Sequence, residues 1–370
     1  MSAPEAGTAE TQFPCGQCGA KLEFQPGAET LKCHYCGFEN AIRKSEAEVE
    51  ELDFEAFLAE AASKADQCER LTVKCSSCAA ESSFDPHITS AHCPFCGAGI
   101  VAEGVSRKAI KPKALLPFKV TREQALAEFK KWVAGLWFAP GELRRYARTE
   151  ERLNGLYVPY WTYDSATTSF YHGSRGDDYW VSESYTSTVN GRSVTKTRQV
   201  RKTRWRAVSG TVRNRFDDLL VLASRTLPEQ YARKLEPWDL AQLVPYQDEF
   251  LSGFRAESYQ VDLQAGFEHA RKSMDEAIRA AVCSDIGGDH QRIDSVKTQY
   301  REITFKHLLL PIWLFAYRYR ERVFRILVNA RTGEVQGERP WSWAKIALAV
   351  LAVLAGLAAV LALAALAASN

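Results

Sequence analysis

The segment Leu156-Tyr-Val-Pro-Tyr-Trp-Thr-Tyr163 has a counterpart 152 residues further along the chain, Leu308-Leu-Leu-Pro-Ile-Trp-Leu-Phe315. Both are rich in the aliphatic and aromatic residues that favour β-strands, and each follows a stretch with helical spacing. The match predicts an α+β body of two related halves, paired about a common sheet. A chance match of two short segments is the alternative.

Residues 111–340, which contain both segments, predict a mixed α+β cytoplasmic body. Thr121 is a favourable N-cap, and the apolar residues after it recur at helical spacing. Residues 262–282 predict a second amphipathic helix, and residues 308–319 and 322–330 predict two late strands. The body therefore mixes helices with strands rather than repeating one element.

A basic hairpin is predicted between these halves. Asn190-Gly191 separates the polar stretches 178–189 and 192–208 and is typical of a type I′ turn. Because alternate residues of a strand share a face, five cations fall on one side and Trp205 on the other. This side could bind anionic lipid or an acidic protein surface, or nucleic-acid phosphates, or it could be a solvated arm. The five cations are Lys196, Arg198, Lys202, Arg204 and Arg206.

The N-terminal part of the chain carries two related sets of Cys-x-x-Cys pairs. In each set, 14 residues separate the two pairs, and the sets superpose at an offset of 60. We interpret them as two zinc ribbons, residues 13–40 and residues 71–103. The predicted metal ligands are Cys15, Cys18, Cys33, Cys36, Cys75, Cys78, Cys93 and Cys96.

The spacing of these cysteines has a chemical reason. Two cysteines that flank two residues in a tight turn can direct both sulfurs at one ion, and a second pair completes a tetrahedral site. We therefore expect two structural Zn²⁺ ions, each closed by four thiolates and without a position for catalysis. Disulfides, or iron as in rubredoxin, are the alternatives.

The segments around the ribbons differ in character. Residues 1–12 are polar and acidic, lack the apolar core of a signal peptide, and are expected to be disordered. Residues 41–70 predict an acidic helical linker, because Ser45 and Glu48 form a capping box before a helical apolar pattern. The first 70 residues have a net charge of −8 and the rest +10, so the overall +2 is a cancellation. This asymmetry indicates modules with different partners.

The chain closes with an apolar stretch. Residues 346–368 contain no charged or polar side chain, and a helix over 344–368 would be long enough to span a bilayer. Trp341, Trp343 and Lys345 precede it as an interface anchor. The positive-inside rule then predicts a single-pass, tail-anchored protein of the bacterial inner membrane with its body in the cytoplasm.

Catalytic motifs are missing from the sequence. It contains no phosphate-binding loop, no nucleophile elbow and no zinc-protease helix. Asp285, Asp289 and His290 follow a predicted helix, and Gly287-Gly288 among them is a helix stop. A hydrolase that uses these three residues is the third and weakest functional hypothesis.

Several of these motifs together resemble a bacterial family of double zinc-ribbon membrane proteins. Its members are often labelled primosomal-helicase-like or transcription-factor-IIB-type zinc ribbon proteins, although this chain lacks the phosphate loop of a helicase. The resemblance implies a membrane-associated scaffold that acts with membrane-organising proteins of the band-seven type. It is carried by the paired cysteines, Leu116-Pro-Phe118, Leu156 to Tyr163, His172 to Gly176, Asp285 to Asp289, and Val328 to Glu334.

The leading functional hypothesis is therefore a non-enzymatic, membrane-anchored zinc-ribbon adaptor or scaffold. It would bind a cytoplasmic or membrane protein partner through its ribbons while residues 346–368 cross the membrane. The alternative is a nucleic-acid-binding zinc-ribbon protein that uses the basic hairpin.

Overall fold

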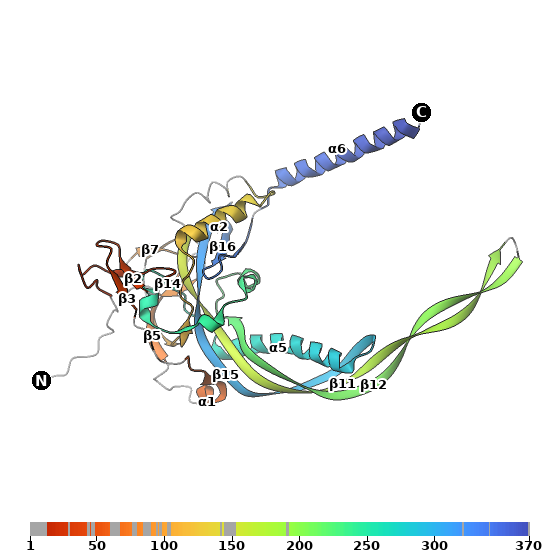
Figure 1. Cartoon of the computed structure of the whole chain (residues 1–370), viewed down its shortest axis with the longest axis horizontal. Coiled ribbons are helices and arrows are strands. Elements are labelled where there is room, and N and C mark those ends of the chain that lie inside the picture. Colours follow the sequence, from red (N-terminus) through yellow and green to blue (C-terminus); the bar gives the residue numbers. More distant parts are fainter. Residues whose placement is uncertain are drawn as a thin grey trace.

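The computed structural model shows a mixed α+β protein with one large antiparallel sheet, several small sheets and a long C-terminal helix (Figure 1). The residues that it describes are 13–28, 30–42, 45, 49–59, 67–75, 80–83, 90–93, 95, 98–101, 105–140, 143, 153–189, 192–319, 322–339 and 341–368. The expected disorder of residues 1–12 and the turn at Asn190-Gly191 lie outside them.

The large sheet is built from two hairpins that pair with each other. The first consists of β11 (Leu153–Val189) and β12 (Arg192–Leu222), and the second of β15 (His290–Tyr319) and β16 (Arg322–Asn329). β11 and β15 are antiparallel neighbours, and β12 and β16 lie outside them.

The two sequence segments that match each other are the segments that pair. Leu156 lies opposite Ile312, and Tyr160 lies opposite Leu308. Side chains of this pair are buried on both faces of the sheet, with Trp161 and Leu310 both at 0% exposure. Burial on both sides explains why these segments are almost continuously apolar.

One face of the pair is covered by two helices, α2 (Arg122–Ala134) and α5 (Leu263–Ile286). α2 packs over the end of the sheet that holds Trp313 and Phe315, and α5 packs over the end that holds Trp161. Both helices begin as predicted: the hydroxyl of Thr121 and the carboxylate of Asp262 accept N-terminal backbone N–H groups.

Each of the two helices is joined to the sheet by a hydrogen bond from a buried tryptophan. The indole of Trp161 donates to the carbonyl of Val261 at 2.9 Å, and the indole of Trp313 donates to the carbonyl of Val120 at 2.9 Å. Each valine directly precedes the N-cap of a helix. Each hairpin is therefore bonded to the entrance of one helix, α5 for the first hairpin and α2 for the second.

The opposite face of the sheet is covered by short helices and by part of residues 71–103, the segment that the sequence predicts to be the second ribbon. The short helices are α4 (Glu229–Ala232) and η3 (Arg233–Leu235). Leu235, Val73 and Phe95 belong to the same apolar cluster as the buried side chains of this face. The second ribbon thus shares its core with the body.

The first ribbon is a small sheet of β1 (Leu22–Phe24), β2 (Thr30–Cys33) and β3 (Glu39–Ala41). Its Phe24 packs edge-on against Phe250 with ring centroids 5.3 Å apart. The hydroxyl of Ser252 donates to the carbonyl of Leu22 at 2.6 Å, so this ribbon is docked on the body.

The linker between the ribbons is less helical than expected. Within its described part, the helix α1 covers only Phe54–Ala59, and Leu52–Asp53 form the strand β4 at the edge of β15. These two residues pair with Thr304 and Phe305 of β15, and the carboxylate of the preceding Glu51 accepts from the ammonium group of Lys306 at 2.9 Å. Contacts with β15 therefore hold this part of the linker extended, where the local pattern predicts helix.

The remaining elements are short, apart from the C-terminal helix α6 (Trp343–Ala368), which projects from the body (Figure 1). They are β5 (Gln67–Lys74), β6 (Glu81–Ser83), β7 (Ser90–His92), β8 (Gly99–Val101), β9 (Val105–Ile110), β10 (Ala114–Leu115), η4 (Leu240–Gln242), β13 (Val244–Pro245), η5 (Asp248–Leu251), β14 (Arg255–Ala256) and β17 (Val335–Gly337).

The close approach of α5 to the sheet predicts that Gly266→Ala destabilises the protein. A Cβ atom at this position would lie 2.4 Å from the hydroxyl oxygen of Tyr163 and 2.9 Å from the ring of Trp161. Overpacking of this kind costs about 1–3 kcal/mol, measured as the free energy of unfolding in urea. Gln264→Ala on the exposed side of the same turn is the control, and equal effects would contradict the close packing.

Candidate functional site

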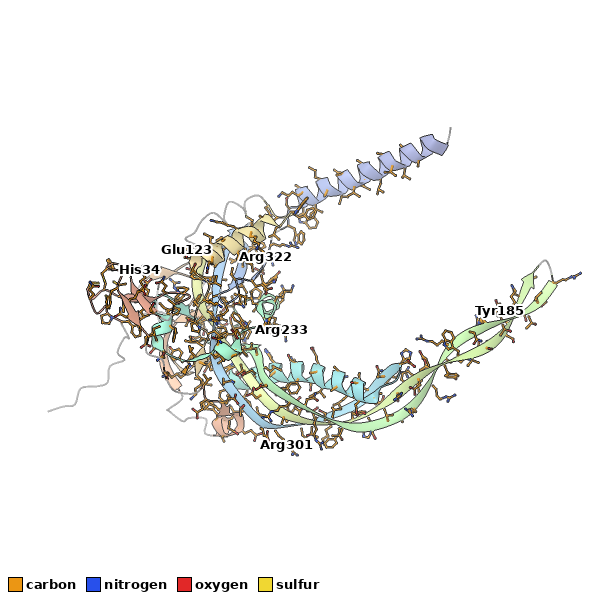
Figure 2. All side chains as sticks on the ribbon, viewed as in Figure 1. His34, Glu123, Tyr185, Arg233, Arg301 and Arg322 are labelled. Atoms are coloured by element: carbon orange, nitrogen blue, oxygen red, sulfur yellow. The ribbon has the colours of Figure 1, made fainter. Side chains whose placement is uncertain are left out.

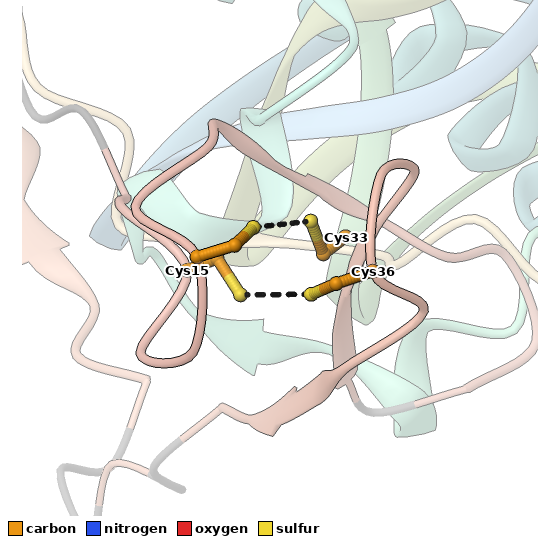
Figure 3. Close-up of side chains that lie close together, drawn as sticks. Cys15, Cys33 and Cys36 are labelled. Atoms are coloured by element: carbon orange, nitrogen blue, oxygen red, sulfur yellow. Dashed lines mark hydrogen bonds between the residues drawn. The ribbon is translucent and has the colours of Figure 1, made fainter.

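The four cysteines of the first ribbon converge on one point (Figure 3). The sulfurs of Cys15 and Cys36 are 3.5 Å apart, those of Cys18 and Cys33 are 3.5 Å apart, and all four lie within 4.8 Å of one another. In a tetrahedral zinc–thiolate site with bonds of 2.3 Å, neighbouring sulfurs are about 3.8 Å apart. This four-cysteine cluster could hold a metal ion such as zinc.

Backbone hydrogen bonds shape both turns of the cluster. The N–H of Cys15 donates to the carbonyl of Ala20 at 2.7 Å, and the N–H of Cys33 donates to that of Phe38 at 3.0 Å. Each turn contains a glycine, Gly19 or Gly37, with a φ of 74°. Glycine adopts this left-handed conformation without steric cost, which explains its place after each cysteine pair.

The surroundings of the sulfurs favour a thiolate at Cys33 and a protonated thiol at Cys36. The N–H of Cys36 lowers the pKa of the Cys33 thiol, which falls to about 6 despite burial. The N–H of Phe38 lowers the pKa of the Cys36 thiol, but burial and hydrogen bonds from the other cysteines outweigh it and raise this pKa to about 12. Four thiols this close share protons among themselves, and a divalent cation would relieve that competition.

In the predicted second ribbon, the first cysteine of each pair makes the same backbone hydrogen bond. Cys75 and Cys93 are both 2% exposed, and their N–H groups donate to the carbonyls of Ala80 and Ala98 at 2.8 and 2.7 Å. In all four pairs the first cysteine therefore donates to the residue five positions later. The predicted ligands Cys78 and Cys96 lie outside the described residues.

The predicted basic hairpin is the outer part of a longer one, in which β11 and β12 pair from Tyr160 and Leu222 to Val189 and Arg192. Beyond Gly176, the last residue of β11 that pairs with β15, the two strands of the first hairpin form ladder pairs only with each other within the described chain. We call this two-stranded part, residues 177–189 and 192–204, the arm. It reaches far from the body, and Figure 2 shows Tyr185 in its outer part.

The register of the arm separates two chemically different faces. Cross-strand neighbours share a face, and Tyr179 lies opposite Lys202 while Tyr185 lies opposite Lys196. The five predicted cations all lie on this face, which we call the basic face; Arg206 sits at its base, opposite Arg175. The other face carries serine and threonine together with Trp180 and Trp205.

Acidic residues neutralise part of the basic face. Lys202 donates to Glu183 at 2.7 Å, which lowers the pKa of Glu183 and raises that of Lys202. Arg198 lies 3.5 Å from the same carboxylate and 5.6 Å from the ring centroid of Tyr185. Among the residues that the structure describes, no carboxylate forms an ion pair with Lys196 or Arg204, although Arg204 stacks on the ring of Tyr179 at 5.0 Å.

A buried carboxylate fixes the base of the arm. The side chain of Asp178 is 11% exposed and accepts from Arg201 at 2.8 Å and from the hydroxyl of Thr203 at 2.6 Å. His290 lies 3.2 Å from the same carboxylate. The Thr203 hydroxyl, with help from Arg201 and His290, lowers the pKa of Asp178. The group is therefore an anion that ties β11 to β12 and β15.

The segment Asp285–His290 belongs to this attachment. Asp289 accepts the N–H of Asp178 at 2.8 Å, and Asp285 accepts the hydroxyl of Tyr171 at 2.6 Å. That hydrogen bond raises the pKa of Tyr171 to about 12. The three residues of the hydrolase hypothesis therefore make structural contacts at the base of the arm, where each has a partner on β11.

A second acidic cluster, which sequence reasoning missed, surrounds Lys306. Its ammonium group lies 2.6 Å from Asp218 and 2.9 Å from Glu51, and Asp164 completes the cluster. Because Lys306 is 7% exposed and supplies the positive charge between these carboxylates, we interpret the cluster as an ion-pair network rather than a metal site. Only the fold brings these residues together, so no sequence signal marked them.

The described residues thus define a mixed α+β protein with one four-cysteine centre and one apolar C-terminal helix that, by length and composition, could cross a membrane. The chain is a distant homologue of a Bacillus subtilis (strain 168) protein described as "Uncharacterized protein YdjG", with 24% identity over 263 residues. The match covers 68% of this chain and 70% of that protein. No protein-family model and no solved structure matches the chain.

The environment of Asp164 predicts a pH-dependent stability that Asp164→Asn would alter. Burial, aided by the neighbouring Glu51, raises the pKa of Asp164 to about 6, against opposing bonds from the Asp218 N–H and Thr304. The stability contributed by its protonated form is complete below the ordinary value of 3.8 and is lost as pH rises through about 6.

At pH 8, the free energy of unfolding of Asp164→Asn should therefore be about 1–2 kcal/mol higher than that of the parent protein. The reason is that a neutral amide replaces a carboxylate whose ionisation is unfavourable in the folded state. The difference should shrink at pH 5. Urea titrations of both proteins at each pH measure it, and Asp217→Asn, at an exposed position of β12, is the control. A difference independent of pH would contradict the raised pKa.

Proposed function

We propose that this chain is a non-enzymatic, membrane-anchored zinc-ribbon adaptor that binds a protein partner. The observation that carries the proposal is the arm, whose basic face combines Lys196, Lys202 and Arg204 with Tyr179 and Tyr185. Tyrosine and arginine are enriched at protein interfaces, and cationic side chains select partners with acidic surfaces. The binding surface is therefore presented away from the folded body.

The physics of a two-stranded ribbon supports this role. Such a ribbon is marginally stable in water on its own, and the arm leaves Trp180, Tyr185 and Val194 at 66%, 42% and 42% exposure. A partner laid on the basic face would bury Tyr185 and Val194 and complement the cations. In this proposal the two zinc ribbons have a stabilising role. Four thiolates fill every position around each zinc ion, and the ion supplies folding free energy to a short segment.

A photocrosslinking amino acid tests the binding surface in cells. We expect p-benzoylphenylalanine at Tyr185 to form protein adducts several times more often than at Ser184, which is exposed on the opposite face of the same strand. Charge reversal by Lys196→Glu with Arg198→Glu should lower the yield about tenfold, equivalent to 1.4 kcal/mol of binding. Equal, low yields at both positions would indicate a solvated arm instead.

Nucleic-acid binding is the second candidate, favoured by the same pairing of cations with aromatic rings. It requires nuclease-sensitive adducts at Tyr185 and an affinity that falls steeply with salt. Replacing Arg198, Lys202 and Arg204 by alanine would abolish that affinity if the basic face makes the contact. Protein adducts that resist nuclease favour the adaptor.

We also propose that each ribbon holds one structural Zn²⁺ ion. The support for the second site is that Cys75 and Cys93 repeat the burial and the backbone bonds of Cys15 and Cys33. Four thiolates form the tetrahedral sulfur set that zinc prefers.

Metal analysis of the full-length protein in detergent tests this stoichiometry. About two zinc ions per chain are expected from two four-thiolate sites. Cys33→Ser and Cys75→Ser should each retain about one ion, and the double variant none. Cys283→Ser is the control, since this cysteine lies outside both ligand sets, and should retain both ions. An unchanged zinc content in Cys75→Ser would exclude the second site.

We further infer that α6 anchors the protein in the bacterial inner membrane, with the body in the cytoplasm. Its stretch Trp343–Ala362 is long and apolar enough to cross a membrane, and none of its side chains is buried in the described structure. Arg331, Arg339 and Lys345 precede the apolar stretch, as the positive-inside rule expects of a cytoplasmic flank. Membrane-organising proteins of the band-seven type and anionic lipids are the candidate partners at this surface.

We infer, finally, that the body consists of two related halves. The matching segments share more than sequence: Trp161 and Trp313 make equivalent indole bonds, and Pro159 and Pro311 accept equivalent N–H groups from Ala223 and Ala330 at 3.0 and 3.2 Å. The two tryptophans and the two prolines are each 152 residues apart, and their partners lie at corresponding places in the fold. Each valine precedes the N-cap of a helix, and each alanine directly follows an outer strand, β12 or β16. These shared contacts favour related halves over a chance match.

A further inference from the structure

An exposed aromatic surface lies at the start of α6. It comprises two residues from the turn after α2 and two from the segment that leads into α6. We call it the aromatic collar, and its members are Trp137 (82% exposed), Phe138 (39%), Trp341 (50%) and Trp343 (76%). The sequence places two of these residues about 200 positions from the other two, so only the fold assembles the collar.

Hydrogen bonds hold the two parts of the collar together. The N–H of Ser342 donates to the carbonyl of Phe138 at 2.8 Å, and the ammonium group of Lys345 donates to the carbonyl of Ala139 at 2.7 Å. In Figure 1 the C-terminal end of α2 accordingly lies beside the first turn of α6. Trp137 and Phe138 therefore lie at the level where the apolar helix begins.

The turn buries its smaller apolar side chains and exposes its largest one. Leu136 and Ala139 are buried at 7% and 5% exposure, whereas the larger Trp137 between them is exposed. The conformation is fixed by backbone bonds from Leu136 to Val133 at 3.2 Å and from Ala139 to Leu136 at 3.3 Å. The turn therefore directs the indole ring of Trp137 outward while Leu136 and Ala139 are buried.

The headgroup layer of a membrane is an environment that accepts an indole ring. Tryptophan is enriched at the depth where a transmembrane helix enters the bilayer, because its ring is apolar and its N–H is polar. Cations accompany the collar, as they do at membrane interfaces: the guanidinium of Arg339 lies 4.5 Å from the ring centroid of Trp341, and Lys345 lies in the first turn of α6.

We propose that the turn Gly135–Ala139 inserts Trp137 and Phe138 into the headgroup layer of the bilayer that α6 crosses. The proposal rests on α6 being a membrane anchor, as inferred above. The occupant of the collar is lipid because hydrogen bonds place the collar at the first turn of α6, whose apolar side chains would lie in the bilayer. Two contacts, one from α6 and one from the turn, then hold α2 and the sheet at a defined height above the membrane.

Depth-dependent fluorescence quenching tests the proposal on the full chain. A genetically encoded fluorescent amino acid, acridonylalanine, replaces Trp137 in protein reconstituted into phosphatidylcholine–phosphatidylglycerol vesicles. Quenching by lipids with a doxyl group at acyl carbon 5 should be several times stronger than for Tyr35→acridonylalanine. Tyr35 is the matched control because it is an aromatic residue with 87% exposure on the first ribbon. Aqueous iodide should quench the fluorophore at position 35 more strongly than the fluorophore at position 137.

A third position separates failure of the anchor from failure of the inference. Leu354→acridonylalanine lies within α6 and reports whether the helix enters the bilayer. If Leu354 is quenched by the doxyl lipid while Trp137 is quenched only by iodide, the turn lies in water and the proposal is overturned. Shielding of position 137 from both quenchers would mean that protein covers the collar, which also overturns it. Absence of doxyl quenching at Leu354 would overturn the anchor itself, and with it the proposal.

Discussion

The antiparallel pairing of β11 with β15 is the constraint on which the rest of the structure depends. Where Tyr157 lies opposite Pro311 and Pro159 opposite Leu309, the sheet is buried on both faces, so both must be covered. Helices α2 and α5 cover one face, and the second ribbon with α4 covers the other. Each ribbon is too short to build a core alone, so the pairing also provides the surface on which it folds.

The prolines in these central strands explain how the ends of the outer strands bind the two helices. Proline lacks the N–H that a strand interior needs, and beside Pro159 the carbonyl of Ala223 instead accepts N–H groups from Gln260 and Val261. Beside Pro311, the carbonyl of Ala330 accepts from Lys119 and Val120 in the same way. Each proline thus frees one carbonyl of the outer strand to bind the entrance of a helix. A residue poorly suited to a central strand therefore positions the helices that bury it.

Much of this arrangement could be predicted from local pattern. The cysteine spacing predicted the four-cysteine cluster, and the match between Leu156–Tyr163 and Leu308–Phe315 predicted strands of one sheet, because metal geometry and apolar burial act over a few residues. The unbroken length of β11 could not be predicted. Gly173 suggests a break, yet it is required by close packing, since a Cβ there would lie 2.4 Å from the carbonyl oxygen of Arg292. The extended Leu52–Asp53, the network around Lys306 and the aromatic collar all depend on residues distant in sequence.

A continuous series of contacts connects the arm to the start of α6. Asp178 and Asp289 fix the arm where it leaves the sheet, and the sheet is bonded through Trp313 and Val120 to the entrance of α2. The far end of α2 carries the turn that is bonded to α6 through Lys345. If that turn rests in the headgroup layer, every link from bilayer to arm is made by packed or hydrogen-bonded elements rather than by a loose tether. Such a connection would give the base of the arm, where Asp178 and Asp289 hold it, a fixed height and direction relative to the bilayer.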